Sequence, residues 1–548
     1  MDFHSRRKIA HDLLDILADE GVTHIFGNPG STELPLMDAL VDRPDLTYVL
    51  GMQEATVVAM ADGYALKTGR PAFVNLHTAG GLGNAMGALV ASQTSRTPLV
   101  VTAGQQDTRH LSTDPWLSGD LVALAAPVSK WATEIRRAED LGPALRRAFE
   151  IARTPPMGPV FLSLPMDIMN EASTGPVSPR LTSSRSSFAP DLLDVAGRLA
   201  AFAPDKIAIV LGDDIPEDAA QGILAVAHVG GYGVFGTQLA SRAAYSSDDI
   251  FWHGMLRPDL SAARSILSSY EAVLLIGSRA FISYPYREDA PLNPGTLVIH
   301  IADNSVAIGS DVACDIAVVG DIGTSLIALA AALAPLIDNS IVRQRHQELD
   351  CTAAERKMRI RREIASDGIL PLSADAATLA VLENLSPETI IVNESAATFG
   401  KVQELMKTAP GLYFFARGGV LGCAMPAAVG MALAGDGPVI CFTGDGGAMY
   451  SPQALWSAAH HASNVIFVVF NNRRYNVLMD VAAAGGYKNA TERRFVGMQL
   501  DDPAIDYTAL AKALGVAAYR ADSVEDISMI IREAQQASGP SLVEILIR

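Results

Sequence analysis

Cysteine is scarce in this sequence of 548 residues, and its four cysteines show no CxxC spacing. Neither a disulfide framework nor a zinc-binding motif is therefore supported, and we expect a reducing compartment. Basic residues are also fewer than acidic ones, which gives a formal net charge of −18, and the sequence shows no basic patch that would offset this negative charge locally. A nucleic-acid partner is not expected, because phosphate contacts need clustered Lys and Arg.

Long apolar runs are missing as well. The longest one, residues 326–337, is too short to cross a bilayer and contains Pro335. Behind the basic residues of the N-terminus, Asp12 and Asp15 interrupt the apolar positions, which indicates an amphipathic helix rather than a signal peptide. We expect a cytoplasmic protein without a membrane partner.

The length is too great for one hydrophobic core. Short β-branched or aromatic runs alternate with helical stretches, as is typical of parallel strands with crossover helices. The sequence therefore predicts an α/β protein of three doubly wound parallel-sheet domains, over residues 1–180, 190–340 and 365–548. We expect a Ser/Thr/Pro-rich linker at 173–187 and a helical connector at 343–362. The predicted strands are 72–76, 99–102, 160–165, 207–211, 272–276, 297–301, 389–392, 438–443, 465–470 and 541–546, and the clearest helix is 54–66.

The strongest motif is Gly444-Asp445-Gly446, which follows a predicted buried strand. After residues 447–470 comes the pair Asn471-Asn472, which ends another predicted strand. Both parts therefore lie at carboxyl ends of strands, where open parallel sheets bind ligands.

The residue types of this motif suit a diphosphate with a divalent metal. Glycines let the backbone approach a diphosphate closely. Asp445 and the amide oxygen of Asn472 are hard oxygen ligands suited to Mg²⁺ or Ca²⁺, and Arg474 is the expected donor of a backbone carbonyl. The alternative is two unrelated turns, since a lone Gly-Asp-Gly is common.

This pattern resembles the diphosphate-binding signature of the thiamine-diphosphate-dependent enzyme family, and the resemblance extends over essentially the whole chain. The three segments are similar in order to the family's pyrimidine-binding, central and diphosphate-binding domains. Within the family, the chain is most similar to the benzoylformate decarboxylases. The matching motifs are residues 26–31, 53–55, 61–65, 75–80, 83–89 and 101–106. The resemblance implies thiamine diphosphate and Mg²⁺ as cofactors, with cofactor contacts from Gly444, Gly446, Gly447 and Tyr475.

Three residues are expected to carry the catalysis. Glu54 leads a stretch rich in Ala, Val and Met, whose apolar side chains would favour its protonated form. The resemblance places the family's activating glutamate here, where a carboxylic acid protonates the cofactor's aminopyrimidine ring. His77 ends the predicted strand 72–76 and enters a Gly-rich turn, and the resemblance implies that it transfers protons to and from the substrate. Ser31 is expected to hydrogen-bond the substrate carboxylate, the alternative being a simple turn serine.

Apolar residues of the third segment are expected to shape the pocket. Leu421 matches the bulky residue that lies beneath the cofactor's thiazolium ring, although a core leucine is an alternative reading. Val477 and Leu478 fall where the family lines its substrate pocket.

The sequence departs from the benzoylformate decarboxylase pattern at three places. Those enzymes carry a second catalytic histidine in the central domain, and Tyr284 stands in its place here. Ala396 and Ala397 occupy positions where hydroxyl residues are expected. His110 lies in a loop that supplies histidines elsewhere in the superfamily, but a solvent-facing histidine is an equal alternative.

The resemblance implies a non-oxidative 2-oxo-acid decarboxylase with carboligase side activity, which acts on small 2-oxo acids and aldehydes. The alternatives are acetolactate synthase, aldehyde lyase or 2-hydroxyacyl-CoA lyase activity, or a non-catalytic cofactor-binding subunit. His77 favours decarboxylation, and the second segment shows no convincing flavin-binding pattern. A homodimer at least, and a homotetramer by resemblance, is expected, because the family combines the counterparts of Glu54 and Asp445 from different subunits.

Overall fold

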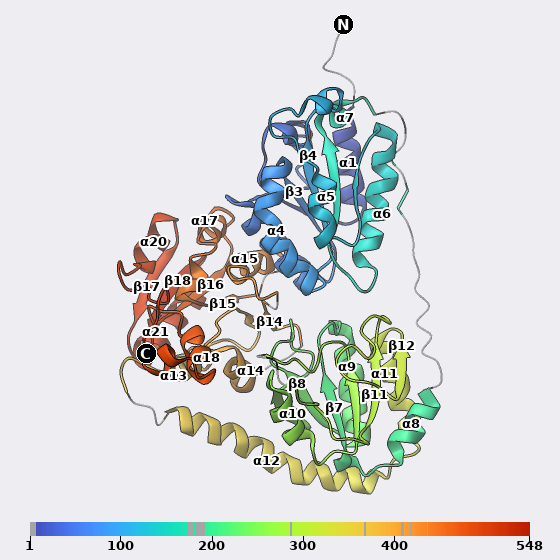
Figure 1. Cartoon of the computed structure of the whole chain (residues 1–548), viewed down its shortest axis with the longest axis vertical. Coiled ribbons are helices and arrows are strands. Elements are labelled where there is room, and N and C mark those ends of the chain that lie inside the picture. The colour runs from blue at the N-terminus through green and yellow to red at the C-terminus, as the bar shows by residue number, and fades with distance from the viewer. Residues whose placement is uncertain are drawn as a thin grey trace.

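The computed structural model describes residues 7–548 except positions 174, 176, 178, 181–191, 285, 287, 366–368, 407–409, 417 and 436. Three six-stranded sheets follow one another along the chain, each with helices packed against it (Figure 1). Every strand pair in them is parallel. The predicted α/β class with three parallel-sheet domains is confirmed. The predicted linker at 173–187 lies for the most part outside the described residues.

The first sheet has the strand order β2-β1-β3-β4-β6-β5. Neighbouring residues of one strand face opposite sides, so Phe73 packs in the cluster with α1 and α6, while Val74 packs in the cluster with α3 and α4. Both faces are therefore buried, as in parallel sheets generally. The elements are β1 (His24–Gly27), β2 (Thr47–Leu50), β3 (Ala72–Leu76), β4 (Leu99–Gln105), β5 (Ala132–Glu134), β6 (Val160–Pro165), α1 (Ile9–Asp19), α2 (Leu34–Leu40), α3 (Glu54–Thr68), α4 (Thr78–Thr94), α5 (Leu121–Ala125), α6 (Leu141–Arg153) and α7 (Met166–Asn170).

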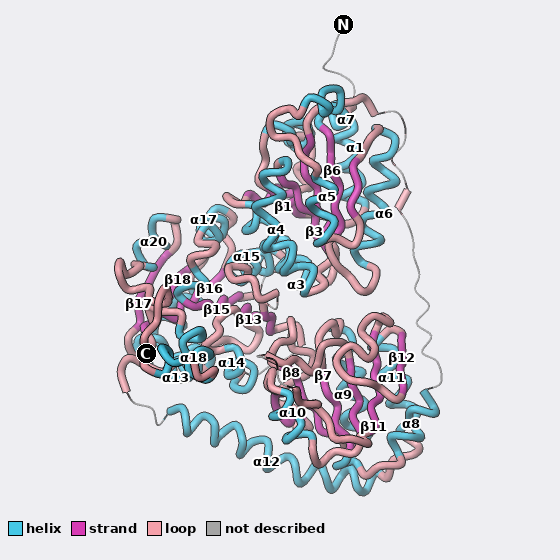
Figure 2. Tube along the Cα trace, viewed as in Figure 1, coloured by secondary structure: helices cyan, strands magenta, loops and turns pink. Residues whose placement is uncertain are grey.

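The central sheet has the order β12-β11-β10-β7-β8-β9. Its elements are β7 (Ile207–Leu211), β8 (Gly233–Thr237), β9 (Trp252–Leu256), β10 (Ala272–Ile276), β11 (Leu297–Ala302), β12 (Ile316–Val319), α8 (Leu192–Ala200), α9 (Ala220–Gly230), α10 (Leu260–Leu267) and α11 (Ile322–Leu333). The single helix α12 (Asn339–Ala365) then runs from the central domain to the third (Figure 2). The predicted connector at 343–362 lies inside it.

The third sheet has the order β14-β13-β15-β16-β18-β17. Its strands are β13 (Ile390–Asn393), β14 (Tyr413–Phe415), β15 (Val439–Gly444), β16 (Val465–Asn471), β17 (Ala517–Ala521) and β18 (Ser541–Leu546). Its helices are α13 (Ala374–Leu382), α14 (Phe399–Leu405), α15 (Ala424–Leu433), α16 (Asp445–Ala448), α17 (Gln453–His460), α18 (Asn476–Ala484), α19 (Lys488–Thr491), α20 (Tyr507–Ala513) and α21 (Val524–Gln536). The exact domain boundaries stay predictions. Within the described residues, no helix combines the length and the apolar character needed to span a membrane.

The first and third domains share one apolar cluster, which includes Val57 of α3, Leu89 of α4 and Val429 of α15. Glycines bring α3 and α15 into backbone contact. A Cβ added at Gly63 would lie 2.1 Å from the carbonyl oxygen of Ala427, and one at Gly430 would lie 1.8 Å from that of Met60. Side chains larger than hydrogen cannot fit at these two positions without moving a helix.

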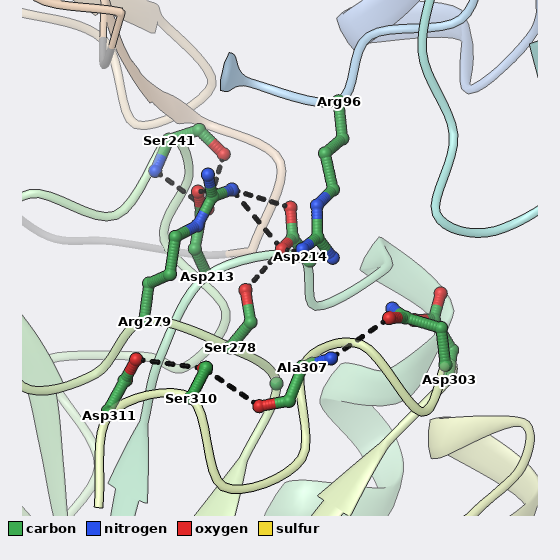
Figure 3. Close-up of polar contacts among 12 residues, drawn as sticks. Arg96, Asp213, Asp214, Ser241, Ser278, Arg279, Asp303, Ala307, Ser310 and Asp311 are labelled. Atoms are coloured by element: carbon green, nitrogen blue, oxygen red, sulfur yellow. Dashed lines mark hydrogen bonds and ion pairs between the residues drawn. The ribbon is translucent and has the colours of Figure 1, made fainter. Parts of the chain in front are cut away.

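A polar network joins the first domain to the central one (Figure 3). Arg96, which follows α4, forms an ion pair of 2.7 Å with Asp214 at the carboxyl end of β7. Arg279, after β10, contacts Asp213 at 3.3 Å and Asp214 at 3.2 Å. The Ser241 backbone N–H also donates to Asp213 at 2.9 Å. The carboxyl edge of the central sheet is thus filled by the chain's own charged groups.

The α3–α15 contact makes a stability prediction. Replacing Gly430 by Ala should lower the apparent melting temperature, because the new methyl group meets backbone atoms of α3 and overpacking costs about 1–3 kcal/mol. The matched control is Gly197→Ala in α8, where a Cβ meets nothing within 4 Å. That variant should hold or raise the melting temperature through better helix propensity. Thermal scans at one heating rate compare the two, and equal melting temperatures would contradict the packing argument.

Candidate active site

The predicted diphosphate-binding motif lies where two neighbouring strands end. In the β15–β16 pair, Gly444 is opposite Phe470, so Asp445 and Asn472 follow at the same edge. The backbone N–H of Arg474 lies 3.3 Å from Oδ2 of Asp445 and 3.1 Å from Oδ1 of Asn472. Two oxygen ligands from segments far apart in the sequence therefore converge on one point.

Asp445 is a nearly buried carboxyl group. Burial raises its pKa above the ordinary value, and backbone N–H groups, that of Gly446 first, act in the opposite direction. Its Oδ1 accepts the Gly446 N–H at 2.8 Å, and the Tyr507 hydroxyl donates to its backbone carbonyl at 2.7 Å. The side chain is thus held in place by neutral groups, and a bound cation would compensate its negative charge.

The donor set fits a hard divalent metal. It combines the carboxylate of Asp445 with the amide oxygen of Asn472, and a backbone carbonyl such as that of Arg474 together with water would complete the ligands that Mg²⁺ prefers. The Arg474 carbonyl already accepts the N–H of Asn476 at 3.0 Å and keeps a second lone pair. No cluster of three or more His, Cys, Asp or Glu side chains suited to a metal occurs in the described part of the chain.

The glycines of the motif have different surroundings. A Cβ at Gly444 would enter open space, whereas one at Gly446 would lie 2.3 Å from the Tyr475 ring. A Cβ at Gly447 would lie 2.8 Å from the Thr443 hydroxyl. Gly446 and Gly447 are therefore needed to close the loop on itself, and the space in front of Gly444 is open to a ligand.

Glu54 is the first residue of α3, since the Gln53 side chain caps this helix by accepting the Thr56 N–H at 3.0 Å. Its carboxylate lies against α4, where Asn84 Nδ2 donates to Oε2 at 3.1 Å. A Cβ at Gly81 would come within 3.1 Å of Oε1. The side chain is only half-buried in the single chain, so its apolar enclosure is incomplete there.

His77 follows β3 and is the N-cap residue of α4. The prediction of a Gly-rich turn after His77 is wrong, because Gly80, Gly81 and Gly83 all lie inside this helix. Gly81 packs against Glu54, and the other two glycines face open space. The imidazole is 22% exposed, and its Nδ1 lies 2.8 Å from Oε2 of Glu33.

Glu33 was not expected as a site residue. It belongs to the short 3-10 helix η1 (Ser31–Glu33), which also carries the exposed Ser31. Because β1 pairs with β3, with Gly27 opposite Asn75, η1 and His77 lie at the same sheet edge. A carboxylate three residues after Gly30, just beyond the matched segment 26–31, was the sequence signal that could have identified Glu33.

The predicted pocket residues of the third domain lie on an open face. Leu421, in the turn before α15, is 40% exposed, and Val477 and Leu478 in the first turn of α18 are 45% and 48% exposed. Apolar side chains with this exposure are available to a ligand or a second subunit.

The remaining predicted residues are also exposed. Tyr284 is 69% exposed, and its backbone N–H donates to Pro258 O at 3.0 Å. Ala396 and Ala397 follow β13, and His110 lies in the 3-10 helix η2 (Thr108–Thr113). Among the described residues, no hydrogen bond joins these side chains to Glu54, His77 or Asp445, so their roles stay predictions.

Comparisons with known proteins agree with this geometry. Residues 7–124 match the thiamine pyrophosphate enzyme N-terminal TPP binding domain, and residues 398–545 match the C-terminal TPP binding domain. The chain is 33% identical over 540 residues to a benzoylformate decarboxylase of Pseudomonas aeruginosa, covering 97% of each. It is 27% identical over 483 residues to the acetolactate synthase isozyme 3 large subunit of Escherichia coli, covering 83% of this chain and 81% of that one.

Solved structures show the same relationship. The benzoylformate decarboxylase of Polynucleobacter necessarius superposes with a TM-score of 0.86 at 28% identity, over 99% of this chain and 98% of that one. The thiamine diphosphate-dependent 4-hydroxybenzoylformate decarboxylase of Rhodococcus jostii gives a TM-score of 0.87 at 29% identity, over 99% of both. The chain therefore belongs to the thiamine-diphosphate-dependent enzymes of the decarboxylase and acetolactate synthase superfamily.

Proposed function

We propose that this chain is a non-oxidative 2-oxo-acid decarboxylase that resembles benzoylformate decarboxylase and forms carbon–carbon bonds in a side reaction. The observation that carries the proposal is His77, which is anchored by Glu33 at the same sheet edge as Ser31. A histidine so placed can move a proton at the substrate oxygen. When bound, thiamine diphosphate supplies the electron sink for the carbanion left by loss of carbon dioxide.

The chain's own residues divide the remaining work. Asp445 and Asn472 would hold Mg²⁺, which in turn holds the diphosphate. Glu54 would exchange a proton with the aminopyrimidine ring, and Leu421 would support the thiazolium ring. Ser31 would hydrogen-bond the substrate carboxylate before it leaves as carbon dioxide.

The apolar wall of the pocket would come from Val477 and Leu478. These two side chains suit an aromatic or branched substrate better than a charged one. Their exposure in the single chain leaves room for such a group.

An acetolactate synthase activity is the second candidate, since relatives with that name match 98% and 83% of this chain in sequence. The central domain argues against a flavin-dependent variant. At the switch point between β7 and β10, where doubly wound sheets bind nucleotides, Asp213 and Asp214 are already paired with Arg279 and Arg96 (Figure 3). The ion pairs occupy the Arg96 and Arg279 guanidinium groups, which could otherwise bind a diphosphate.

Two further alternatives have less support. The aldehyde lyase and CoA lyase alternatives need no histidine in the place of His77. A non-catalytic cofactor-binding subunit would use Asp445 to hold the metal, but it would need neither the activating carboxyl group of Glu54 nor the histidine His77.

A direct assay tests the proposal. The purified protein with thiamine diphosphate and Mg²⁺ should release carbon dioxide from aromatic or branched 2-oxo acids and yield the corresponding aldehydes. Acetolactate formed from pyruvate as the faster reaction would support the second candidate instead. Turnover of none of the panel would refute the proposal.

Metal dependence is a separate prediction. Chelation of divalent metal should release the cofactor and abolish activity, because among the described residues only backbone N–H groups hydrogen-bond the Asp445 carboxylate, and these cannot take the metal's place. Asp445→Ala should behave like chelation even with excess Mg²⁺, while Asp194→Ala on the surface of α8 should behave like the parent. Cofactor retention is measured by its absorbance after gel filtration. Full activity in chelator would exclude the assignment.

A shared site in a homodimer, and a homotetramer built from such dimers, is also proposed. Several apolar side chains near the expected cofactor positions are left open by one chain, namely Leu34, Met52, Leu421 and Tyr450, with exposures of 61%, 56%, 40% and 60%. A second copy that places its Glu54 opposite this chain's Asp445 would cover such a face.

Mixed dimers test this arrangement. Glu54→Gln should lower activity by on the order of 10²–10⁴-fold, because the amide cannot protonate the ring nitrogen. Co-expression of Glu54→Gln with Asp445→Ala, purified through two different tags, should restore about half of the parental activity, since one of the two shared sites is then intact. A mixed dimer as inactive as its parents would show that each chain builds its own site.

We propose that Tyr284 shifts the substrate range of this chain away from that of the benzoylformate decarboxylases. If it replaces the missing histidine, Tyr284→His should gain rate on benzoylformate relative to a branched aliphatic 2-oxo acid. Tyr286→His is the matched control, since Tyr286 is 81% exposed in the same segment. Steady-state rates on both acids decide the point, and an unchanged ratio would make Tyr284 a bystander.

A further inference from the structure

Glu33 is a buried carboxylate whose oxygens are both engaged twice. Its side chain is 1% exposed. Oε1 accepts the backbone N–H of Gly104 at 3.0 Å and the hydroxyl of Thr32 at 2.7 Å. Oε2 accepts the backbone N–H of Gly30 at 2.8 Å and lies 2.8 Å from Nδ1 of His77. Four groups thus surround the four lone-pair directions of one carboxylate.

Three of these four groups are hydrogen-bond donors to Glu33. The Gly30 and Gly104 N–H groups and the Thr32 hydroxyl all donate, so the carboxylate is the acceptor at each of these contacts. An ionised carboxylate only accepts hydrogen bonds, so the proton of its bond to His77 must come from the imidazole. Nδ1 therefore carries a hydrogen, and Thr32 Oγ1, 3.0 Å away, is a second acceptor for it.

The surrounding backbone is shaped for this pair. A Cβ at Gly30 would lie 2.3 Å from the His77 ring, and a Cβ at Gly104 would lie 2.1 Å from Oε1 of Glu33. Neither Gly30 nor Gly104 has a positive φ. Glycine is therefore needed at these two positions because the His77 ring and the Glu33 carboxylate lie so close to the backbone, and not because of turn geometry. This contact gives a structural reason for Gly30 in the motif 26–31 and for Gly104 in the motif 101–106.

We infer that Glu33 is a positioning residue that holds His77 with its proton on Nδ1 and its lone pair on Nε2. Nε2 makes no hydrogen bond within the part of the chain that is described, and it is the nitrogen left to exchange a proton with a substrate. Glu33 also compensates the positive charge that His77 gains when it takes a proton. His77 occupies the N-cap position of α4, but its side chain makes no capping hydrogen bond there.

The catalytic part of this inference rests on the proposed decarboxylase function, whereas the tautomer does not. In Glu33→Gln the shape is kept, but an amide N–H can face Nδ1 and reverse the tautomer, so that Nε2 carries the hydrogen. Diethyl pyrocarbonate acylates an unprotonated imidazole nitrogen. The rate at which the holoenzyme's His77 is acylated, followed by peptide mass spectrometry, should therefore fall at least several-fold in the variant.

Kinetics on the best 2-oxo acid complete the test. Glu33→Gln should lower kcat by on the order of 10²–10⁴-fold with KM within a few-fold, as loss of a group that orients a catalytic histidine does. In the His77→Asn background, the same change should have almost no further effect on kcat, because Glu33 acts through His77. The control Thr32→Val keeps the carboxylate and its contact with Nδ1 and should lose less than about tenfold, since it removes only the neutral hydroxyl that donates to Oε1 and faces Nδ1.

The outcomes separate the two ideas. A changed acylation rate in a protein that decarboxylates no 2-oxo acid would uphold the Glu33–His77 pair and reject the proposed function. An unchanged acylation rate, or a further large loss of kcat in the His77→Asn background, would overturn the inference and leave Glu33 as a support for the loops. If Glu33→Gln does not fold, Glu33→Asp replaces it, because the shorter side chain withdraws the carboxylate from Nδ1. Glu33→Asp should lower kcat when His77 is present and should have almost no effect on kcat in the His77→Asn background.

Discussion

The backbone contact between α3 and α15 is the constraint on which the rest of the molecule depends. Two glycines let the helices approach until backbone atoms touch, and one apolar cluster spans the first and third domains. At or just before its N-terminal end, each of the two helices also has a predicted cofactor-binding residue. Glu54 begins α3, and Leu421 lies in the turn that leads into α15. Packing of the helices therefore sets the relative positions of the two cofactor-binding domains.

Parallel sheets explain why the chemistry gathers at edges. Their faces are buried by helices on both sides, so only the carboxyl ends of the strands are open to ligands. The first and third sheets present His77 and Asp445 there. The central sheet has the same architecture, but its edge is closed by ion pairs that include one to Arg96 of the first domain. The same fold thus presents candidate site residues in two domains and carries ion pairs between domains in the third.

The candidate site joins a rigid part to an open part. Asp445 and Glu33 each accept a hydrogen bond of 2.8 Å from a backbone N–H group. Glu33 is also 2.8 Å from Nδ1 of His77. The apolar residues expected to contact cofactor and substrate, such as Leu421 and Val477, remain exposed in a single chain. This division suits a site in which polar groups are set in advance and a second subunit closes the pocket.

The sequence by itself determined the features that are local in the chain. Strongly apolar central strands such as 72–76 and 207–211, the helix that starts at Glu54 and the positions of Gly444 and Asn471 at strand ends could all be predicted, because each depends on neighbouring residues. Short strands such as β14 (Tyr413–Phe415) and β5 (Ala132–Glu134), both at sheet edges, were missed because they bury too few side chains to leave a pattern. Only the tertiary structure decided that Glu33 meets His77 and that Gly430 meets Met60. These contacts join residues far apart in the sequence, and strand pairing and helix packing, which no local pattern records, bring them together.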